Sequence, residues 1–176
     1  MLRECLGKGS SLLLDKEYII QEVIGRGASC LVYDGFYTDP SDGRHRVRIK
    51  ECFPYHIIAK RDSQGRIVPA ESWKDAFEKA KNIFSDAYIR NTEIRNTMGL
   101  TNATIDPLWN QEQNNTVYSV MSYIEGKDYE NYEENCLKDI FTRMKRLCKI
   151  IGGYHKEGCL HLDIKPENIL IPSDTK

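Results

Sequence analysis

The sequence has no long apolar run, no excess of either charge and no internal repeat. No apolar run approaches the ~20 residues that span a bilayer, and Leu12-Leu13-Leu14 is followed at once by charged residues, so it is too short for a signal-peptide core. The formal net charge is −1, with 29% charged residues. This balance argues against binding to nucleic acid or to an anionic membrane. We therefore expect no nucleic-acid partner and no membrane segment within this chain.

Paired cysteines are also missing. Six cysteines are scattered without a C-x-x-C pair, at Cys5, Cys30, Cys52, Cys136, Cys148 and Cys159. This spacing matches neither a zinc site nor a disulfide framework. Because the sequence carries no secretory signal, we expect reduced thiols and a cytoplasmic location.

The first half of the chain reads as strands joined by turns. At 176 residues, the chain can form one domain or a small domain with an extension. Two β-rich runs, residues 17–25 and 29–37, precede a third expected strand over residues 44–50. Turn residues between these runs favour an antiparallel meander, and residues 62–65 predict a further turn inside a polar connection. Residues 1–16 are interpreted as a short lead-in.

From Trp73 the hydrophobic period changes from two to about 3.6 residues, which indicates an amphipathic helix. Gly99 is expected to close this helix. Its apolar face is expected to contain Trp73, Ala76, Phe77, Ala80, Ile83, Phe84, Ala87 and Tyr88.

A second β pair and a second helix follow. The pair is expected over residues 104–110 and 116–124, with residues 111–115 as its turn. The second helix is predicted over residues 137–156, and Gly158 lies just past its end, where a helix-terminating glycine belongs. The fold class is therefore α+β, with an antiparallel sheet followed by a helical part that begins near Asp128.

Residues 161–170 carry side chains suited to phosphoryl transfer. Asp163 can accept a hydroxyl proton, Lys165 can neutralise charge on a moving phosphate, and Asn168 can hold a divalent metal. The alternative is a polar turn between a helix and a strand. The stretch closely resembles the catalytic loop of protein kinases, H-R-D-x-K-x-x-N.

The loop departs from the family pattern at one place. Leu162 replaces the Arg of H-R-D, which argues against regulation by a phosphorylated activation loop. Lys165 in D-x-K-P-E-N is typical of serine/threonine-directed members, and His161 is expected to be structural rather than catalytic.

The resemblance implies a fold and its boundaries. A kinase N-lobe, an antiparallel sheet with helix C, would occupy residues 17–122. The first helices and the catalytic loop of the C-lobe would occupy residues 123–176. The run Lys50-Glu51-Cys52-Phe53-Pro54 resembles a bacterial branch of the family. ATP, Mg²⁺ and a protein substrate with Ser or Thr are the implied cofactors and partner.

The residues around Gly25 resemble the glycine-rich loop that covers ATP phosphates. Ile24, Gly25, Gly27 and Val32 match the loop and its flanks, while Cys30 replaces the third glycine. Glycines let the backbone approach a phosphate closely and offer it N–H groups. A simple turn between strands is the alternative interpretation.

Lys50, in Val47-Arg48-Ile49-Lys50, is similar to the lysine that binds the α- and β-phosphates. Arg48 replaces a small residue that lines the adenine pocket in the family, so it would crowd that pocket. The acidic partner of Lys50 is expected to be Glu93, with Asp86 as the competitor on the same helix. An ordinary surface lysine and an ordinary exposed glutamate are the alternatives.

Residues 118–126 resemble the last N-lobe strand and the hinge. Met121 would be the gatekeeper and Tyr123 a hinge residue of the ATP site, with Ser122 in place of the common Glu. The hinge binds adenine through backbone groups, so this replacement is compatible with binding.

The 176 residues contain no D-F-G and no A-P-E sequence, although D-F-G supplies the main Mg²⁺ ligand in the family. We therefore expect the N-terminal portion of a protein serine/threonine kinase, which by itself transfers phosphate weakly or not at all. The alternative is a non-catalytic, kinase-like module that binds a nucleotide or a protein, favoured by Cys30 and Arg48.

Overall fold

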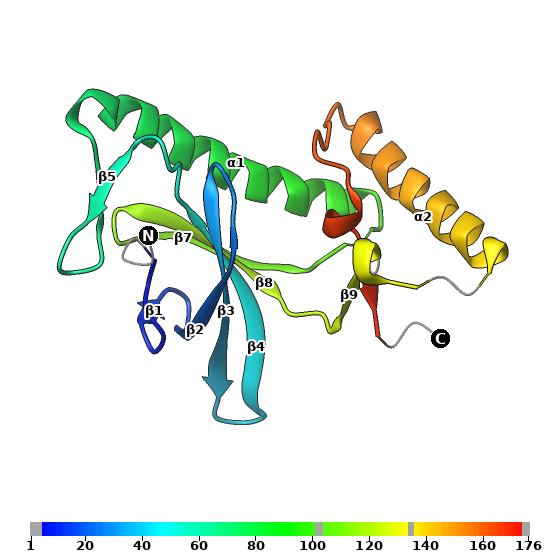
Figure 1. Ribbon diagram of the computed structural model, residues 1–176, viewed down its shortest axis with the longest axis horizontal. Coiled ribbons are helices and arrows are strands. Elements are labelled where there is room, and N and C mark those ends of the chain that lie inside the picture. The colour runs from blue at the N-terminus through cyan, green and yellow to red at the C-terminus, as the bar shows by residue number, and fades with distance from the viewer. Residues whose placement is uncertain (1–4, 101–103, 134–135, 174–176) are drawn as a thin grey trace. The chain divides into compact units, whose positions relative to one another are not determined.

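The computed structural model describes residues 5–100, 104–133 and 136–173 (Figure 1). It divides into two compact units. The first comprises the chain as far as Thr92 together with Asp106–Tyr123, and the second comprises Glu93–Ile105 and the chain from Ile124 onward. Each unit is described separately.

The first unit is built on an antiparallel six-stranded sheet in the order β1-β2-β3-β4-β8-β7. The predicted meander corresponds to three consecutive strands of this sheet. The expected lead-in contributes the edge strand β1. The strands are β1 (Ser11–Leu13), β2 (Glu17–Arg26), β3 (Cys30–Asp39), β4 (Gly43–Cys52), β7 (Pro107–Gln113) and β8 (Thr116–Ser122).

The turn between β7 and β8 is shorter than the five residues expected. Asn114 and Asn115 have φ of 52° and 59°, and they join the two strands directly. Asparagine tolerates this left-handed conformation better than most residues, so a tight two-residue hairpin forms.

The polar connection after β4 contains a hairpin that the sequence did not predict, formed by β5 (Ile58–Arg61) and β6 (Ile67–Pro69). The expected turn at residues 62–65 joins the two strands. A 3₁₀ turn, η2 (Glu71–Trp73), leads into α1 (Lys74–Thr97). Gly99 lies beyond the end of α1 with φ of +62°, as predicted for a helix-closing glycine.

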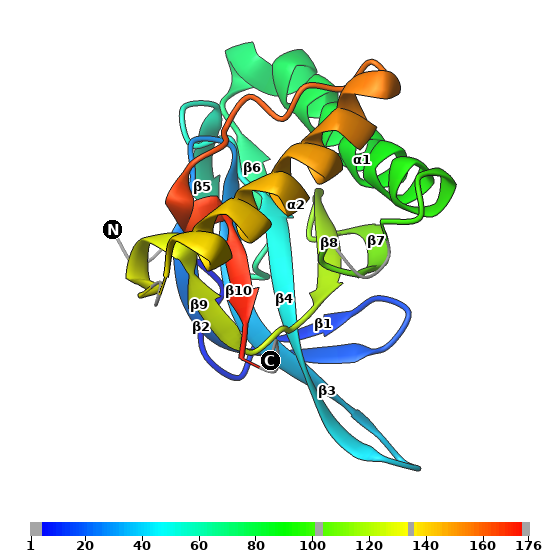
Figure 2. The same cartoon turned by 90° about the vertical axis from the view of Figure 1, so that its right-hand side faces the viewer.

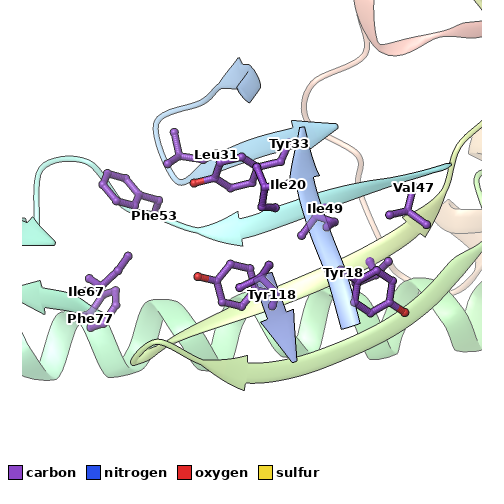
Figure 3. Close-up of a cluster of buried hydrophobic side chains, with 12 residues drawn as sticks. Tyr18, Ile20, Leu31, Tyr33, Val47, Ile49, Phe53, Ile67, Phe77 and Tyr118 are labelled. Atoms are coloured by element: carbon purple, nitrogen blue, oxygen red, sulfur yellow. The ribbon is translucent and has the colours of Figure 1, made fainter. Parts of the chain in front are cut away.

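Buried hydrophobic side chains of the first unit form a cluster, and most of its members alternate along the strands (Figure 3). Period-two alternation directs every second side chain of β3 and β4 to this side of the sheet. The cluster contains Leu12, Tyr18, Ile20, Leu31, Tyr33, Val47, Ile49, Phe53, Ile67, Phe77, Tyr118 and Val120.

The predicted apolar face of α1 is only partly buried. Phe77 is fully buried in the cluster, whereas Trp73 and Ile83 are 51% and 59% exposed. Trp73 also lies before α1 rather than within it. Within the first unit, the core therefore contacts α1 at Phe77 and does not extend under Ile83.

The second unit contains α2 (Leu137–Lys156), whose bounds match the prediction. Strand β9 (Gly126–Asp128) pairs antiparallel with β10 (Leu170–Pro172), and Figure 2 shows the two strands side by side. The 3₁₀ turns η3 (Tyr129–Asn131) and η4 (Pro166–Asn168) complete the unit. A Cβ at Gly126 would overlap the carbonyl oxygen of Ile171, so glycine permits this close pairing.

Within the described part of the chain, no helix combines the length and the apolar composition needed to cross a membrane.

Candidate nucleotide and phosphoryl-transfer site

The three side chains predicted for catalysis and metal binding lie together in the second unit. The Nδ2 of Asn168 donates to the Oδ2 and to the backbone oxygen of Asp163, at 2.8 Å in each case. The Nζ of Lys165 lies 3.3 Å from the Oδ1 of Asp163. All three side chains are exposed, so they are open to a ligand.

Local backbone structure produces this arrangement. Pro166 begins η4, and the backbone N–H of Asn168 donates to the carbonyl of Lys165 at 3.0 Å. Proline suits the first position of a helical turn because its φ is already fixed and its missing N–H is not needed there. The turn brings Asn168 back toward Asp163 within five residues.

The loop also contains a strained residue. Leu162 has a φ of 61° and a side chain that is 87% exposed. Such a backbone costs a residue with a Cβ about 1–2 kcal/mol, and strained residues cluster at functional sites. The Nδ1 of His161 accepts from the backbone N–H of Asp163 at 3.3 Å, a contact consistent with the structural role expected for this histidine. Nothing in the sequence signalled the strain at Leu162, because leucine is not a residue that favours this conformation.

The electrostatics of the loop favour an ionised Asp163. Its hydrogen bond from Asn168 and then its interaction with Lys165 lower the pKa of the Asp163 carboxyl below its usual value. A carboxylate of low pKa is a weak base, but it is a good acceptor for a hydroxyl group. The loop can therefore orient a hydroxyl group toward a phosphate.

Asn168 is suited to holding Mg²⁺ together with phosphate oxygens. Its amide nitrogen is committed to Asp163, which directs the amide oxygen elsewhere. Among the described residues, no hydrogen bond reaches this oxygen. Mg²⁺ is usually bound through one or two protein oxygens plus substrate phosphates, and the amide oxygen of Asn168 fits that pattern.

In the first unit, Lys50 lies on β4, directly between Val32 of β3 and Ser119 of β8. Val32 in turn pairs with Gly25 of β2. Lys50 is half-buried, and it alternates with the buried Ile49, so it lies on the side of the sheet opposite the core. The structure therefore brings Gly25, Val32 and Lys50 into one row across three strands.

The glycine-rich segment forms a tight turn next to the row of Gly25, Val32 and Lys50. The backbone N–H of Gly27 donates to the carbonyl of Cys30 at 2.8 Å, which forms the turn between β2 and β3. A Cβ at Gly25 would lie 3.4 Å from the Cβ of Val32, so the backbone passes close to its neighbour there. Ile24 precedes this turn and is 44% exposed.

The acidic partner of Lys50 stays a prediction. Asp86 is exposed on α1, and no hydrogen bond or ion pair joins it to Lys50 in the described first unit. Glu93 is exposed near the end of α1 and belongs to the second unit, so the expected Lys50–Glu93 pair is not tested.

The predicted gatekeeper, Met121, lies near the end of β8, and the predicted hinge residue, Tyr123, follows the last residue of that strand. Met121 is half-buried directly opposite Arg48 of β4. The Tyr123 ring lies beneath two guanidinium groups, those of Arg46 and Arg48, at 4.0 and 4.6 Å from the ring centroid. Asp34, which the sequence did not single out, holds both arginines.

On the core side of the sheet, the residue after Lys50 forms a buried polar network. Glu51 is fully buried and accepts from the Nη2 of Arg61 at 2.8 and 2.9 Å. It also accepts from the hydroxyls of Tyr33 at 2.6 Å and Tyr118 at 2.7 Å. Burial raises the pKa of both tyrosines, which keeps these hydroxyls protonated as donors. The sequence did contain a signal for this buried position, because Val47, Ile49 and Glu51 are alternate residues of β4 and therefore face the same side of the sheet.

Comparison with known proteins agrees with this geometry, although no family model matches the chain. The chain is 32% identical over 158 residues to a probable casein kinase II subunit alpha homolog of Encephalitozoon cuniculi, covering 89% of the chain and 39% of the relative. It is 26% identical over 164 residues to the serine/threonine-protein kinase unc-51 of Caenorhabditis elegans, covering 91% of the chain and 16% of that relative.

The solved structure of the apo form of PpkA-294 matches 97% of this chain with a TM-score of 0.70 and 26% identity, and 58% of that structure is covered. The chain thus has a kinase-like α+β fold. The chain is therefore similar in sequence and in fold to serine/threonine protein kinases, and it spans less than half the length of the curated relatives named above.

Proposed function

We propose that this chain supplies the nucleotide-binding lobe and the catalytic loop of a bacterial-type protein kinase, which transfers the γ-phosphoryl group of ATP to a Ser or Thr hydroxyl of a protein. The N-lobe would comprise residues 17–122, and the C-lobe would begin within residues 123–176. The observation that carries this proposal is the Asp163–Lys165–Asn168 arrangement, in which one carboxylate is bonded to an amide and lies beside an ammonium group.

Each side chain has a defined part in the reaction. Asp163 would accept the hydrogen bond of the substrate hydroxyl and orient its oxygen toward the phosphate. Lys165 would balance charge that develops on the transferred group. Asn168 would hold Mg²⁺ through its amide oxygen, and the ion would neutralise charge on the phosphates when bound.

The first unit would bind the nucleotide. Lys50 would contact the α- and β-phosphates beneath the Gly25–Gly27 turn, and Glu93 would orient Lys50. Ile24 and Val32 would contact the base from the sheet. Met121 and Tyr123 would border the base, which hinge backbone groups would bind. We infer a cytoplasmic location from the same similarity to protein kinases.

A second function is favoured by Cys30 and Arg48, which replace residues common in the family. In this case the chain is a non-catalytic module that binds a nucleotide or a protein. The two functions differ in whether Asp163 contributes to phosphoryl transfer.

The test measures transfer of radiolabel from the γ-position of ATP, with Mg²⁺, to a basic protein substrate by the full-length gene product. We expect Asp163→Ala to lower the rate by about 100-fold or more, because electrostatic positioning supplies most of the transition-state stabilisation. Asp139→Ala, an exposed aspartate on α2, is the matched control and should retain the wild-type rate. Equal rates in the wild type and Asp163→Ala would refute the kinase function. Absence of transfer together with intact ATP binding would favour the non-catalytic module.

A further inference from the structure

One buried carboxylate holds two arginines on the face of the sheet that carries Lys50. Asp34 is 6% exposed. It accepts from the Nε of Arg46 at 2.9 Å, from the Nη2 of Arg46 at 3.0 Å and from the Nη1 of Arg48 at 2.6 Å. Both guanidinium groups also lie over the Tyr123 ring. We refer to Asp34, Arg46, Arg48 and Tyr123 as the Asp34 cluster.

The Asp34 cluster lies next to the row that contains Lys50. Asp34 pairs directly with Arg48, which pairs with Met121, and the row of Val32, Lys50 and Ser119 is two residues along the strands. Two residues of a strand span about 7 Å. The paired residues Asp34, Arg48 and Met121 are farther along the strands from the Gly25–Gly27 turn than Lys50 is. A nucleotide whose phosphates contact Lys50 would therefore extend its base toward Arg48.

The anchoring of Arg48 determines whether this space is open. An arginine side chain is long and flexible, and a free guanidinium beside Lys50 would occupy the space meant for a base. Here its charge is paired with Asp34, its guanidinium carbon lies 4.6 Å from the Tyr123 ring centroid, and only 26% of the side chain is exposed. Charge-assisted hydrogen bonds of this kind are among the strong ones, so Asp34 restricts Arg48 effectively.

We infer that Asp34 is a positioning residue that holds Arg48 against Tyr123 and thereby keeps the base site open to a purine nucleotide. This inference rests on the proposed nucleotide-binding function of the same face. It also gives a different role to Arg48 from the one expected from the sequence, where a long side chain would crowd the adenine pocket.

The test is equilibrium binding of a fluorescent ATP analogue, with Mg²⁺, to the 176-residue chain. Removal of the anchor in Asp34→Ala should weaken binding by about 10-fold, equivalent to about 1.4 kcal/mol. Arg48→Ala should bind within about 3-fold of the wild type, since the blocking group is absent. The double variant Asp34→Ala/Arg48→Ala should recover the affinity of Arg48→Ala. Asp39→Ala, a β3 aspartate bonded to Ser41 of its own turn, is the matched control.

A second probe separates positioning from general damage to the fold. Inorganic tripolyphosphate has no base, so Asp34→Ala should bind it at least as tightly as the wild type. The inference is overturned if Asp34→Ala binds the ATP analogue like the wild type. It is also overturned if the double variant stays as weak as Asp34→Ala, which would indicate a merely structural carboxylate. If the wild type and Lys50→Met show the same lack of ATP affinity, the proposed function itself fails, and the role of Asp34 fails with it.

Discussion

At the scale of the residue, Asp163 owes its properties to two neighbours in its own loop. Asn168 donates to its carboxylate and Lys165 lies beside it, and both favour the charged form. Because the pKa of Asp163 is lowered in the folded loop, the ionised Asp163 side chain stabilises this loop conformation at pH values above the ordinary pKa of aspartate. That contribution is lost as the pH falls through the lowered pKa.

Removal of the amide should therefore raise the pKa of Asp163. We expect Asn168→Ala to move it back toward the ordinary value for aspartate, because the first cause of the shift is gone. A pH titration of the Asp163 carboxyl carbon by NMR measures this directly. Asn82→Ala, an exposed asparagine on α1, should leave the titration unchanged. An identical Asp163 titration in wild type and Asn168→Ala would contradict the assignment.

The sequence predicted that the three candidate catalytic and metal-binding residues lie together, because they are close in the chain. A loop of a few residues leaves little freedom, so Asp163, Lys165 and Asn168 were recognisable as a set. Asp34 and Tyr123 are far apart in the chain, and the β-sheet register brings them to the same arginines. That register depends on the whole sheet, so the Asp34 cluster was not predictable from local patterns.

At the scale of the element, α1 shows that an apolar stripe and a buried face are different things. Phe77 is completely buried in the core, and Ile83, less than two turns later, is 59% exposed. The helix pattern was correctly read, but the extent of its packing depends on where the sheet and the β5–β6 hairpin lie.

The two positions should respond differently to truncation. We expect Phe77→Ala to lower the free energy of unfolding by about 3–5 kcal/mol, because it removes buried contacts and leaves a cavity. Ile83→Ala should change it by less than about 0.5 kcal/mol, as is usual for surface positions. Urea denaturation of both variants measures the difference. Similar losses at both positions would mean that Ile83 is buried in solution.

Helix α2 was predicted with its observed bounds because its apolar spacing is regular and Gly158 follows it. The β5–β6 hairpin escaped prediction because its strands are only four and three residues long, and β5 ends in the charged residues Lys60 and Arg61. Short strands of this kind give no clear period-two signal. Contacts with distant segments tie this hairpin to the unit, from Arg61 to Glu51 and from Ile67 to Asn114.

At the scale of the whole molecule, the Glu51 network joins segments that are far apart in the chain. Glu51 contacts Tyr33, Arg61 and Tyr118, which come from three other strands. Burial alone would lower the pKa of Arg61, but Glu51 outweighs this effect, and the Arg61 pKa lies above its ordinary value. The network thus fixes the strand that positions Lys50 from the opposite side of the sheet.

Loss of one charge from this network should be costly. We expect Arg61→Met to reduce the free energy of unfolding by about 3–5 kcal/mol, since Glu51 would be left as an uncompensated buried charge. Lys74→Met, which removes one partner of the exposed Lys74–Glu71 pair, should cost about 0–1 kcal/mol. Chemical denaturation compares the two variants with the wild type. A loss at Arg61 no larger than that at Lys74 would rule out a stabilising role for the buried pair.

The same network restricts how this protein can evolve. A mutation that removes Arg61 leaves the buried Glu51 carboxylate without its counter-charge. A mutation that removes Glu51 takes the counter-charge from Arg61 and the acceptor from two tyrosine hydroxyls. Replacing both charged residues together by apolar ones avoids the cost of an uncompensated buried charge, because buried ion pairs can often be exchanged for well-packed apolar groups with little loss of stability. Across its lineage, Glu51 and Arg61 should therefore be inherited or lost as a pair.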